Sequence, residues 1–259
     1  RAGVYSPEHI RGRGAWWDRG RSILHLGDRL IVDGVIHPVT SPPPTRFNYQ
    51  RLASIDLDHD LEPLTDQEGH LLLEIAGRFH WEVPASGLLI GGWIALAPIC
   101  GSLSWRPHAW LTAAAGSGKS AILDRFIGPL LDALALWPEG NTSEAAIRQV
   151  LRADALPIVF DEAESEDRAS QLRFDKVLEL ARQASTETGA GIVKGTATGG
   201  SVTYLIRSCF LFASIGVAAV KKADTSRVTV LPLRKNTGPC ASEHFDKVKA
   251  LWRDTVAQD

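Results

Sequence analysis

Residues 113–120, Ala-Ala-Ala-Gly-Ser-Gly-Lys-Ser, have the residue types and spacing of a loop that binds phosphate groups. The pattern is a glycine, four free positions and then Gly-Lys-Ser/Thr. Gly118, Lys119 and Ser120 fit its end, whereas Ala113 stands where the first glycine is usual. In such a loop, backbone N–H groups that lead into a helix surround the phosphate oxygens. The residues expected to do so here are Ala115, Gly116, Ser117, Gly118, Lys119 and Ser120.

The chemistry of this loop favours ATP and Mg²⁺ as cofactors. Gly116 and Gly118 can take positive φ and let the backbone approach a phosphate closely. The Lys119 ammonium would reach the β- and γ-phosphates, and the Ser120 hydroxyl would hold Mg²⁺. The apolar run before the loop suits a buried strand, and residues 120–123 continue as a helix. The alternative is a Gly/Ser linker that happens to contain a lysine, which this strand–loop–helix context disfavours.

A pair of acidic residues, Asp161-Glu162, directly follows the apolar run 158–160. Carboxylates at the end of a buried parallel strand form the second half of an ATPase site. We expect Asp161 to hold Mg²⁺ and Glu162 to orient and deprotonate the attacking water. Asp161 lies 42 positions after Lys119, which leaves room for two helices between the two motifs. The alternative is a solvated strand end.

Two further positions follow from the same architecture. Ser214 ends the apolar run 209–213, where a polar side chain can orient the water or contact the γ-phosphate. A serine that caps the strand end is an equal alternative. Arg227 precedes the apolar run at Val228 and could reach the γ-phosphate of a neighbouring subunit as an arginine finger. The alternative is a surface pair with Asp224.

Basic residues outnumber acidic ones near the C-terminal end of this region. Between residues 190 and 230 we count five basic side chains and one acid. Lys194 lies at the edge of a glycine-rich segment, 189–200, that predicts a hairpin or a mobile loop. On a loop that faces a channel, this lysine could contact a nucleic-acid phosphate. A solvated hairpin lysine is the alternative.

Composition limits the remaining possibilities. The 259 residues are 44% apolar and 22% charged with a net charge of −2, so nucleic-acid binding would need a local basic patch. The three cysteines form no CxxC pair, which favours a reduced, cytoplasmic compartment. The most apolar stretch, 87–101, is too short and too interrupted to span a bilayer, so we expect no membrane association. Because the sequence begins at Arg1, we expect it to be a piece of a longer protein.

The order of patterns predicts an α/β protein with a parallel sheet flanked by helices. Residues 1–44 predict a small β-meander, whose Asp33-Gly34 pair favours a hairpin, and Pro42–Pro44 end it. Residues 45–104 predict a helical subdomain that packs on the core, beginning with a capping box at 65–68. Strands and helices alternate through a core at 105–238, including a long helix at 168–184 and one from the loop to about residue 136. A short helix is expected in 239–259.

These motifs together resemble phage- and plasmid-type replicative helicases. That group is the AAA+-like superfamily III class of P-loop ATPases with its prophage primase–helicase relatives. The likeness covers about residues 87–235 and rests on the motifs at 115–120, 159–164, 194, 210–215 and 224–227, with Trp105–Thr112 and Gly140–Ala145 beside them.

The resemblance implies a hexameric ring that hydrolyses ATP between subunits and pulls single-stranded DNA through its channel. Carried over, Lys119 and Ser120 would bind ATP and Mg²⁺, and Asp161 and Glu162 would perform the hydrolysis. Arg227 would be the finger and Lys194 the channel contact in this homo-oligomer. Two residues depart from the pattern: Ala113 in the loop, and Ser214 where such helicases usually carry asparagine.

We therefore expect the ATP-dependent helicase or translocase core of a replication protein from a phage or mobile element. A second hypothesis is an AAA+ loader or assembly switch that hydrolyses ATP without unwinding DNA. A third is a nucleotide-binding structural module, which the Asp161-Glu162 pair argues against.

Overall fold

The computed structural model describes residues 7–57, 64–161, 167–187, 191–195, 201–215 and 226–235. Within strands 191–195 and 201–203 only the backbone is described. Glu162 and the helix expected in 239–259 therefore lie outside the described residues.

The centre of the molecule is a four-stranded sheet in which every neighbouring pair is parallel, as the alternation of strands and helices predicted. The spatial order is β12-β7-β11-β8. Because the strands are parallel, they all begin at one edge of the sheet, here called the amino edge, and end at the other, the carboxyl edge. The strands are β7 (His108–Ala113), β8 (Ile158–Phe160), β11 (Phe210–Ser214) and β12 (Val228–Leu233).

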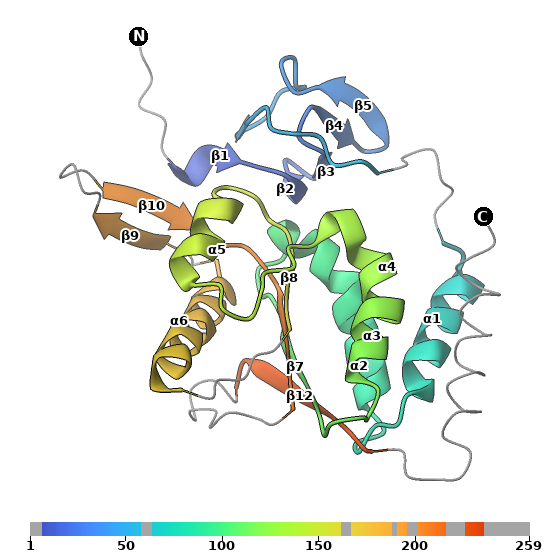
Figure 1. Cartoon of the computed structure of the whole chain (residues 1–259). Coiled ribbons are helices and arrows are strands. Elements are labelled where there is room, and N and C mark those ends of the chain that lie inside the picture. The colour runs from blue at the N-terminus through green and yellow to red at the C-terminus, as the bar shows by residue number, and fades with distance from the viewer. Residues whose placement is uncertain are drawn as a thin grey trace.

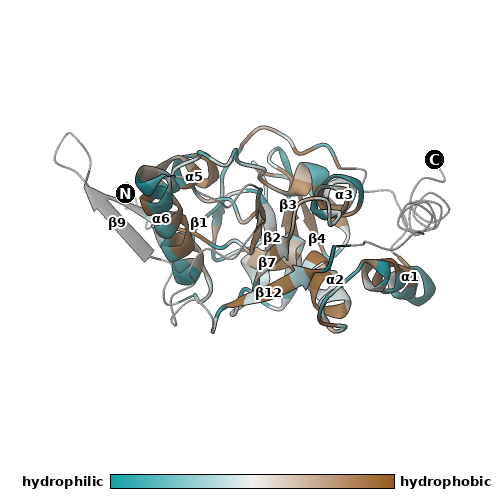
Figure 2. Ribbon diagram, turned by 60° about the horizontal axis from the view of Figure 1, so that its bottom comes forward, coloured by the Kyte–Doolittle hydropathy of each residue, from teal (hydrophilic) through white to brown (hydrophobic). Residues whose placement is uncertain are grey.

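Both faces of this sheet are covered, which explains why its strands are apolar at nearly every position. Successive side chains of a strand point to opposite faces. Accordingly, Leu111 and Leu211 pack in one hydrophobic cluster, while Trp110 and Phe212 pack in a second on the other face. Figure 2 shows apolar residues on the central strands and hydrophilic ones on the outer sides of α1 and α6.

Helices form a layer on each side of the sheet (Figure 1). The layer beside the first cluster holds α1 to α4, and the other holds α5 and α6. Side chains cap several of their N-termini, including the predicted capping box of Thr65 and Glu68. The longer helices are α1 (Asp66–Arg78), α2 (Ser86–Leu96), α5 (Glu144–Leu151) and α6 (Arg168–Ala184), with a 3₁₀ segment η2 (Ala97–Ser102) after α2.

The helix expected from the loop to about residue 136 begins as predicted but is not one regular helix. A π-helical turn interrupts it, and the Gly128 N–H bonds to the Leu123 carbonyl. Pro129 follows directly, and a proline can neither donate a backbone hydrogen bond nor fit against the carbonyl four residues earlier. The wider turn accommodates it. The pieces are α3 (Lys119–Ile122), η3 (Leu123–Ile127), α4 (Gly128–Leu131) and η4 (Asp132–Leu134).

A four-stranded antiparallel sheet precedes the helices and lies at the amino edge of the parallel sheet (Figure 1). Arg13 forms an ion pair with Asp154, with an Nη2–Oδ2 distance of 2.6 Å. Asp154 lies four residues before the first residue of β8. The Asp33-Gly34 hairpin is confirmed, with positive φ at both residues. The strands are β2 (Gly14–Asp18), β3 (Arg21–His25), β4 (Arg29–Val32) and β5 (Val35–Pro38).

Smaller elements complete the described chain. A 3₁₀ turn η1 (Pro7–His9) leads into β1 (Ile10–Arg11), which pairs in parallel with β6 (Asn48–Tyr49). Within the glycine-rich segment, β9 (Gly191–Gly195) pairs antiparallel with β10 (Ser201–Leu205), which directly follows the segment. The expectation of a hairpin-like arrangement is therefore confirmed for these strands. In the described ranges, every helix is too short or too polar to cross a membrane.

Candidate phosphate-binding site

The predicted phosphate-binding loop connects the carboxyl end of β7 to the first residue of α3, Lys119. Gly116 has φ +79° and Gly118 has φ +92°, so both take the left-handed conformation that favours glycine. The Ser117 N–H donates to the Ala114 carbonyl at 3.1 Å and closes the turn. The predicted strand–loop–helix context and the positive φ angles are therefore confirmed.

Lys119 and Asp161 meet at the carboxyl edge of the sheet, although 42 positions separate them along the chain. The Lys119 Nζ lies 2.9 Å from the Asp161 Oδ1. The Lys119 side chain is 15% exposed and that of Asp161 is 43% exposed, so the pair is open to solvent on the carboxylate side. β11 lies between the strands that precede these residues, and the long lysine side chain spans its end. The fold thus brings the two motifs together at one edge of the sheet.

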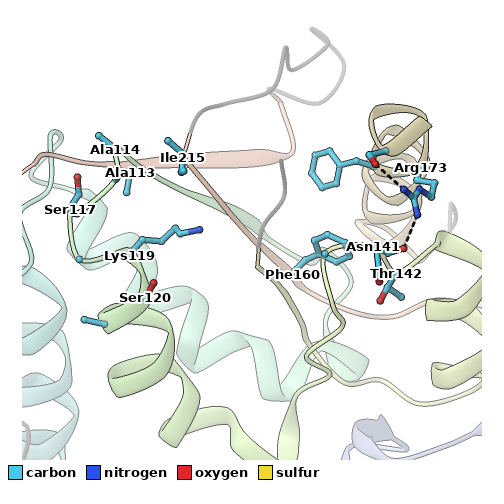
Figure 3. Close-up of a pocket in the computed structure, with 17 residues that line it drawn as sticks. Ala113, Ala114, Ser117, Lys119, Ser120, Asn141, Thr142, Phe160, Arg173 and Ile215 are labelled. Atoms are coloured by element: carbon cyan, nitrogen blue, oxygen red, sulfur yellow. Dashed lines mark hydrogen bonds between the residues drawn. The ribbon is translucent and has the colours of Figure 1, made fainter. Parts of the chain in front are cut away.

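A cavity of about 900 Å³ opens beside this pair, within the size range of small-molecule sites. In Figure 3 the phosphate-binding loop and Lys119 form one wall, while Asn141, Thr142 and Arg173 lie across from them. A smaller hollow of about 370 Å³ beside it is lined by Asp161 and shares Gly140 and Asn141 with the larger one. The main lining residues outside 113–121 are Gly140, Asn141, Thr142, Phe160, Ser170, Arg173, Phe174 and Ile215.

The loop has free hydrogen-bonding capacity for an anionic ligand. The Ser117 hydroxyl is buried and has no hydrogen-bond partner in the described structure. A buried polar group without a partner is unfavourable unless a ligand or water satisfies it. A side chain at Gly116 would meet only the Lys235 Cε, at 3.9 Å, so the backbone there stays open to approach. These features fit a phosphate group.

The oxygen atoms near Lys119 also fit Mg²⁺. Ser120 is exposed on the cavity side of α3 and supplies a hydroxyl, while Asp161 supplies a carboxylate. Mg²⁺ in phosphate sites is commonly held by one or two protein oxygens together with phosphates and waters. The described ranges contain no cluster of three or more His, Cys, Asp or Glu side chains arranged to hold a metal.

Ser214 lies at the predicted strand end but does not face the cavity. Its side chain is fully buried, and its Oγ accepts a hydrogen bond from the Trp110 Nε1 at 2.7 Å. The next residue, Ile215, lines the cavity instead. A role for Ser214 at the γ-phosphate stays a prediction, and its fully buried hydroxyl would have to become accessible to perform it.

Arg227 lies at the opposite edge of the sheet from the phosphate-binding loop. It directly precedes β12, whose first residue pairs with His108, the first residue of β7. Its Nη1 donates to the Arg182 carbonyl at 3.1 Å. From His108 to Ala113, β7 rises by five steps of about 3.3 Å, so about 16 Å separate the two edges. Arg227 therefore cannot contact a phosphate at the loop of its own chain.

Two other predicted residues are placed only in part. Lys194 lies on β9 opposite Val202 of β10, so its backbone is in the expected strand pair while its side chain lies outside the description. Glu162 follows the described Asp161 directly in the sequence but is itself outside the described residues.

Sequence reasoning missed the wall of the cavity that faces Lys119. Residues 140–145 entered the sequence analysis only as part of the resemblance and were given no role at the site, and Ser143 caps α5. Arg173 and Ser170 lie on α6 outside its periodic apolar positions, and a polar residue on a helix surface gives no indication of a binding site. Asp167 caps α6, and hydrogen bonds from the Ser170 backbone and hydroxyl hold the pKa of this carboxyl below its usual value. Glycine and asparagine just before a helix cap were the available signal for a loop at this site.

No protein-family model matches the chain, and no curated protein sequence matches it. Among solved structures, the chain is similar to JCV helicase with an acetamide compound bound, at 12% identity and a TM-score of 0.42, over 77% of this chain and 54% of that one. It is also similar to the A-form apo structure of the NrS-1 C-terminal region, at 13% identity and a TM-score of 0.43, over 98% of this chain and 53% of that one. The chain thus spans about half the length of both structures.

Proposed function

We propose that this chain binds ATP with Mg²⁺ at the phosphate-binding loop and hydrolyses it. The observation that carries the proposal is the 2.9 Å contact between Lys119, which lines the cavity, and Asp161, which lines the smaller hollow beside it. Two sequence motifs that separately suggest phosphate and Mg²⁺ binding are thereby joined in one site. The ion pair itself contributes little to the stability of the fold, because ion pairs that are open to solvent are worth about 0–1 kcal/mol.

The residues divide the chemistry between them. Backbone N–H groups of 115–120 and the Lys119 ammonium would bind the phosphates, and Ser120 and Asp161 would hold Mg²⁺. When bound, Mg²⁺ supplies positive charge that stabilises the negative charge of the transferring phosphoryl group. Asp161 would exchange its contact with Lys119 for the metal, which frees the ammonium for the phosphates. Glu162, next in the chain, would orient the attacking water and accept its proton.

The position of Arg227 supports hydrolysis between subunits rather than within one. Because Arg227 lies at the amino edge, the phosphate that it could contact belongs to a neighbouring copy. We propose that copies of the chain form a ring, a hexamer by resemblance, in which Arg227 enters the next cavity. An arginine supplied in this way can raise the hydrolysis rate by about 10³–10⁵.

We further propose that the ring is the helicase or translocase core of a replication protein from a phage or mobile element. The support is the β9–β10 pair, which carries Lys194 and could bring it to single-stranded DNA in the channel. A loader or assembly switch would use the same ATP site without needing this contact.

The test is ATP hydrolysis by the purified chain with and without single-stranded DNA, together with a mass measurement in ATP. We expect hydrolysis that DNA stimulates and a mass that rises to a ring. Glu162→Gln should bind ATP without hydrolysing it, and wild-type turnover in that variant would remove Glu162 from the role of base. Hydrolysis that ignores DNA and responds to a protein partner would favour the loader instead.

A further inference from the structure

The cavity has a second cationic side chain opposite the phosphate-binding loop. Among the described residues that line it, Lys119 and Arg173 are the two that carry positive charge. Figure 3 shows Lys119 extending into the cavity from the loop and Arg173 lying on the far side, on α6. An anion in the cavity would therefore have a cation on each side.

Arg173 is held in place by neutral acceptors. Its Nη2 donates to the Ser170 Oγ at 2.8 Å, and its Nη1 donates to the Asn141 carbonyl at 3.4 Å. The Ser170 hydroxyl donates its own proton to Asp167 at 2.8 Å, so its lone pairs are available to Arg173. In the described ranges no carboxylate contacts this guanidinium directly, and Asp167 interacts with it electrostatically across Ser170.

These contacts orient Arg173 without neutralising it. A guanidinium has five N–H donors, and the described contacts occupy two of its nitrogens. Hydrogen bonds between ionised partners are roughly twice as strong as neutral ones, so a phosphate oxygen would replace the long contact to Asn141. The side chains of Asn141 and Thr142 line the same wall and offer an amide and a hydroxyl to the same oxygens.

We propose that Arg173, with Asn141 and Thr142, forms the subsite for the terminal phosphate of a nucleoside triphosphate. This inference rests on the proposed binding of ATP at the loop. Lys119 and the loop hold the α- and β-phosphates, which ADP and ATP share, and Arg173 contacts the γ-phosphate from α6. The cavity thereby distinguishes ATP from ADP within one chain, independently of Arg227 from a neighbouring copy.

The same contact links the nucleotide to the arrangement of the protein. With a triphosphate bound, Arg173 turns to the phosphate and releases the Asn141 carbonyl. When the terminal phosphate leaves, the guanidinium returns to Asn141 and joins α6 to the loop 139–142 that precedes α5. The connection between the two helices of this layer would therefore follow the state of the nucleotide.

The test compares the affinities for ADP and for a non-hydrolysable ATP analogue, measured by titration calorimetry with Mg²⁺. Arg173→Ala should weaken binding of the ATP analogue roughly 10- to 100-fold, the range for hydrogen bonds to charged groups. Its affinity for ADP should change less than about twofold, because ADP lacks the phosphate that Arg173 contacts. Arg173→Lys keeps the charge but loses the planar fork, and it should recover part of the loss.

The matched control is Lys176→Ala, which removes an exposed cation from the same helix, one turn further on and outside the cavity lining. It should leave both affinities unchanged. An Arg173→Ala protein that binds the ATP analogue like the wild type, or that loses the two nucleotides equally, overturns the inference. A wild-type chain that binds neither nucleotide overturns the proposed function itself.

A second measurement, with a single-stranded oligonucleotide, distinguishes a phosphate of ATP from a phosphate of a nucleic acid as the ligand of Arg173. If Arg173 contacts the terminal phosphate of ATP, single-stranded DNA binds the Arg173→Ala and wild-type proteins equally when no nucleotide is present. Loss of DNA affinity in this variant with an unchanged preference for the ATP analogue over ADP would assign Arg173 to the nucleic acid and overturn the subsite.

Discussion

The two edges of the parallel sheet carry charged groups in opposite arrangements. At the amino edge, Arg106 is fully buried and its contacts are all with the protein. At the carboxyl edge, Lys119 and Asp161 form a pair that opens onto a cavity, and the Ser117 hydroxyl has no partner among the described residues. The same four strands thus begin beside a closed network and end beside an open site.

The closed network is built around Glu187. Its carboxylate accepts from the Arg106 Nη2 at 2.6 Å and from the Arg207 Nε at 2.7 Å. Burial alone would raise the pKa of Glu187, but the hydrogen bonds and charges of the two arginines outweigh it and hold the pKa below its usual value. Arg106 also donates to the carbonyls of Cys100 and Ala184, at 2.8 and 3.2 Å.

The difference separates stability from ligand binding. The polar atoms of Arg106 and Glu187 at the amino edge are partnered within the chain, so changes in this network should alter the free energy of unfolding. Groups at the carboxyl edge are left for a ligand, so changes there should alter affinity and leave the fold intact. Each variant below tests which edge controls which quantity.

The largest effect is expected from Arg106→Ala, which leaves Glu187 with one fewer partner and empties a buried site. Removing one partner of a fully buried ion pair lowers the free energy of unfolding by about 3–5 kcal/mol. Because the Glu187 side chain is 49% exposed and keeps Arg207, we expect a loss at the lower end of this range. The matched control is Arg78→Ala, because Arg78 forms an exposed pair with Glu74 and should contribute about 0.5 kcal/mol or less. Urea denaturation measures both, and equal losses in the two proteins would contradict the comparison.

Acid should weaken the amino edge through His108. The Phe210 N–H donates to its Nδ1 at 3.0 Å, so the Nε2 carries the proton and donates to Ser185 at 2.9 Å. Burial, with the charge of Arg106 adding to it, lowers the pKa of His108 from 6.5 to about 4. Between pH 6.5 and 4 the His108 ring is therefore protonated in the unfolded chain and neutral in the folded one. The free energy of unfolding falls as the pH is lowered through this range.

The full loss from His108 is on the order of 3 kcal/mol, at 1.36 kcal/mol per pKa unit. Burial also lowers the pKa of His25, which adds a loss of the same sign. Denaturation at a series of pH values gives the total, and the titration of the His108 ring by NMR isolates its share. A His108 ring that titrates near pH 6.5 in the folded protein would contradict the assignment.

Lys119→Ala should have the reverse profile, with a large effect on affinity and a small one on stability. The variant removes the cation that we propose binds the phosphates, and we expect ATP affinity to fall at least about 100-fold, roughly 3 kcal/mol. The melting temperature should stay within about 2 °C of the wild type, because the pair with Asp161 is open to solvent. Calorimetric titration and thermal denaturation measure the two quantities. A large fall in melting temperature would place Lys119 with the stabilising residues.

The smallest effect comes from a matched pair of glycines. Gly116 in the phosphate-binding loop has φ +79°, Gly20 in the β2–β3 turn has φ +78°, and no protein atom would collide with a side chain at either position. Alanine in this conformation costs about 1–2 kcal/mol, so both substitutions should lower stability by similar amounts. Only Gly116→Ala should also weaken ATP binding, by roughly tenfold. Equal nucleotide affinities in the two variants would show that the loop backbone does not approach the phosphates.

Local features of the fold could be predicted well from the sequence. The bounds of α6 match the prediction at 168–184, because its apolar positions repeat at helical spacing and Asp167 caps its first turn. The conformations of Gly116 and Gly118 followed from the steric freedom of glycine. The π-helical turn at 123–127 did not follow, since widening one turn leaves the pattern of apolar residues almost unchanged.

Features that depend on distant partners could not be predicted in the same way. β2 forms beside β3, but Gly14 at its start also bridges to Ala155, a partner far along the chain. Arg173 reads as an ordinary solvent-facing residue until α6 is placed across the cavity from the loop. The buried state of Ser214 likewise depends on Trp110, which lies on another strand.

The residues alone determined that a phosphate-binding loop lies between a strand and a helix and that acidic residues follow a second strand, because both depend on short-range pattern and backbone sterics. Tertiary structure decided that β11 lies between these strands, that Lys119 reaches across it to Asp161, and that Arg173 forms the opposite wall. It also decided that Arg227 begins at the far edge of the sheet from its own loop. The physical reason is that strand order and helix placement follow from packing both faces of the sheet, which brings together side chains that no local pattern relates.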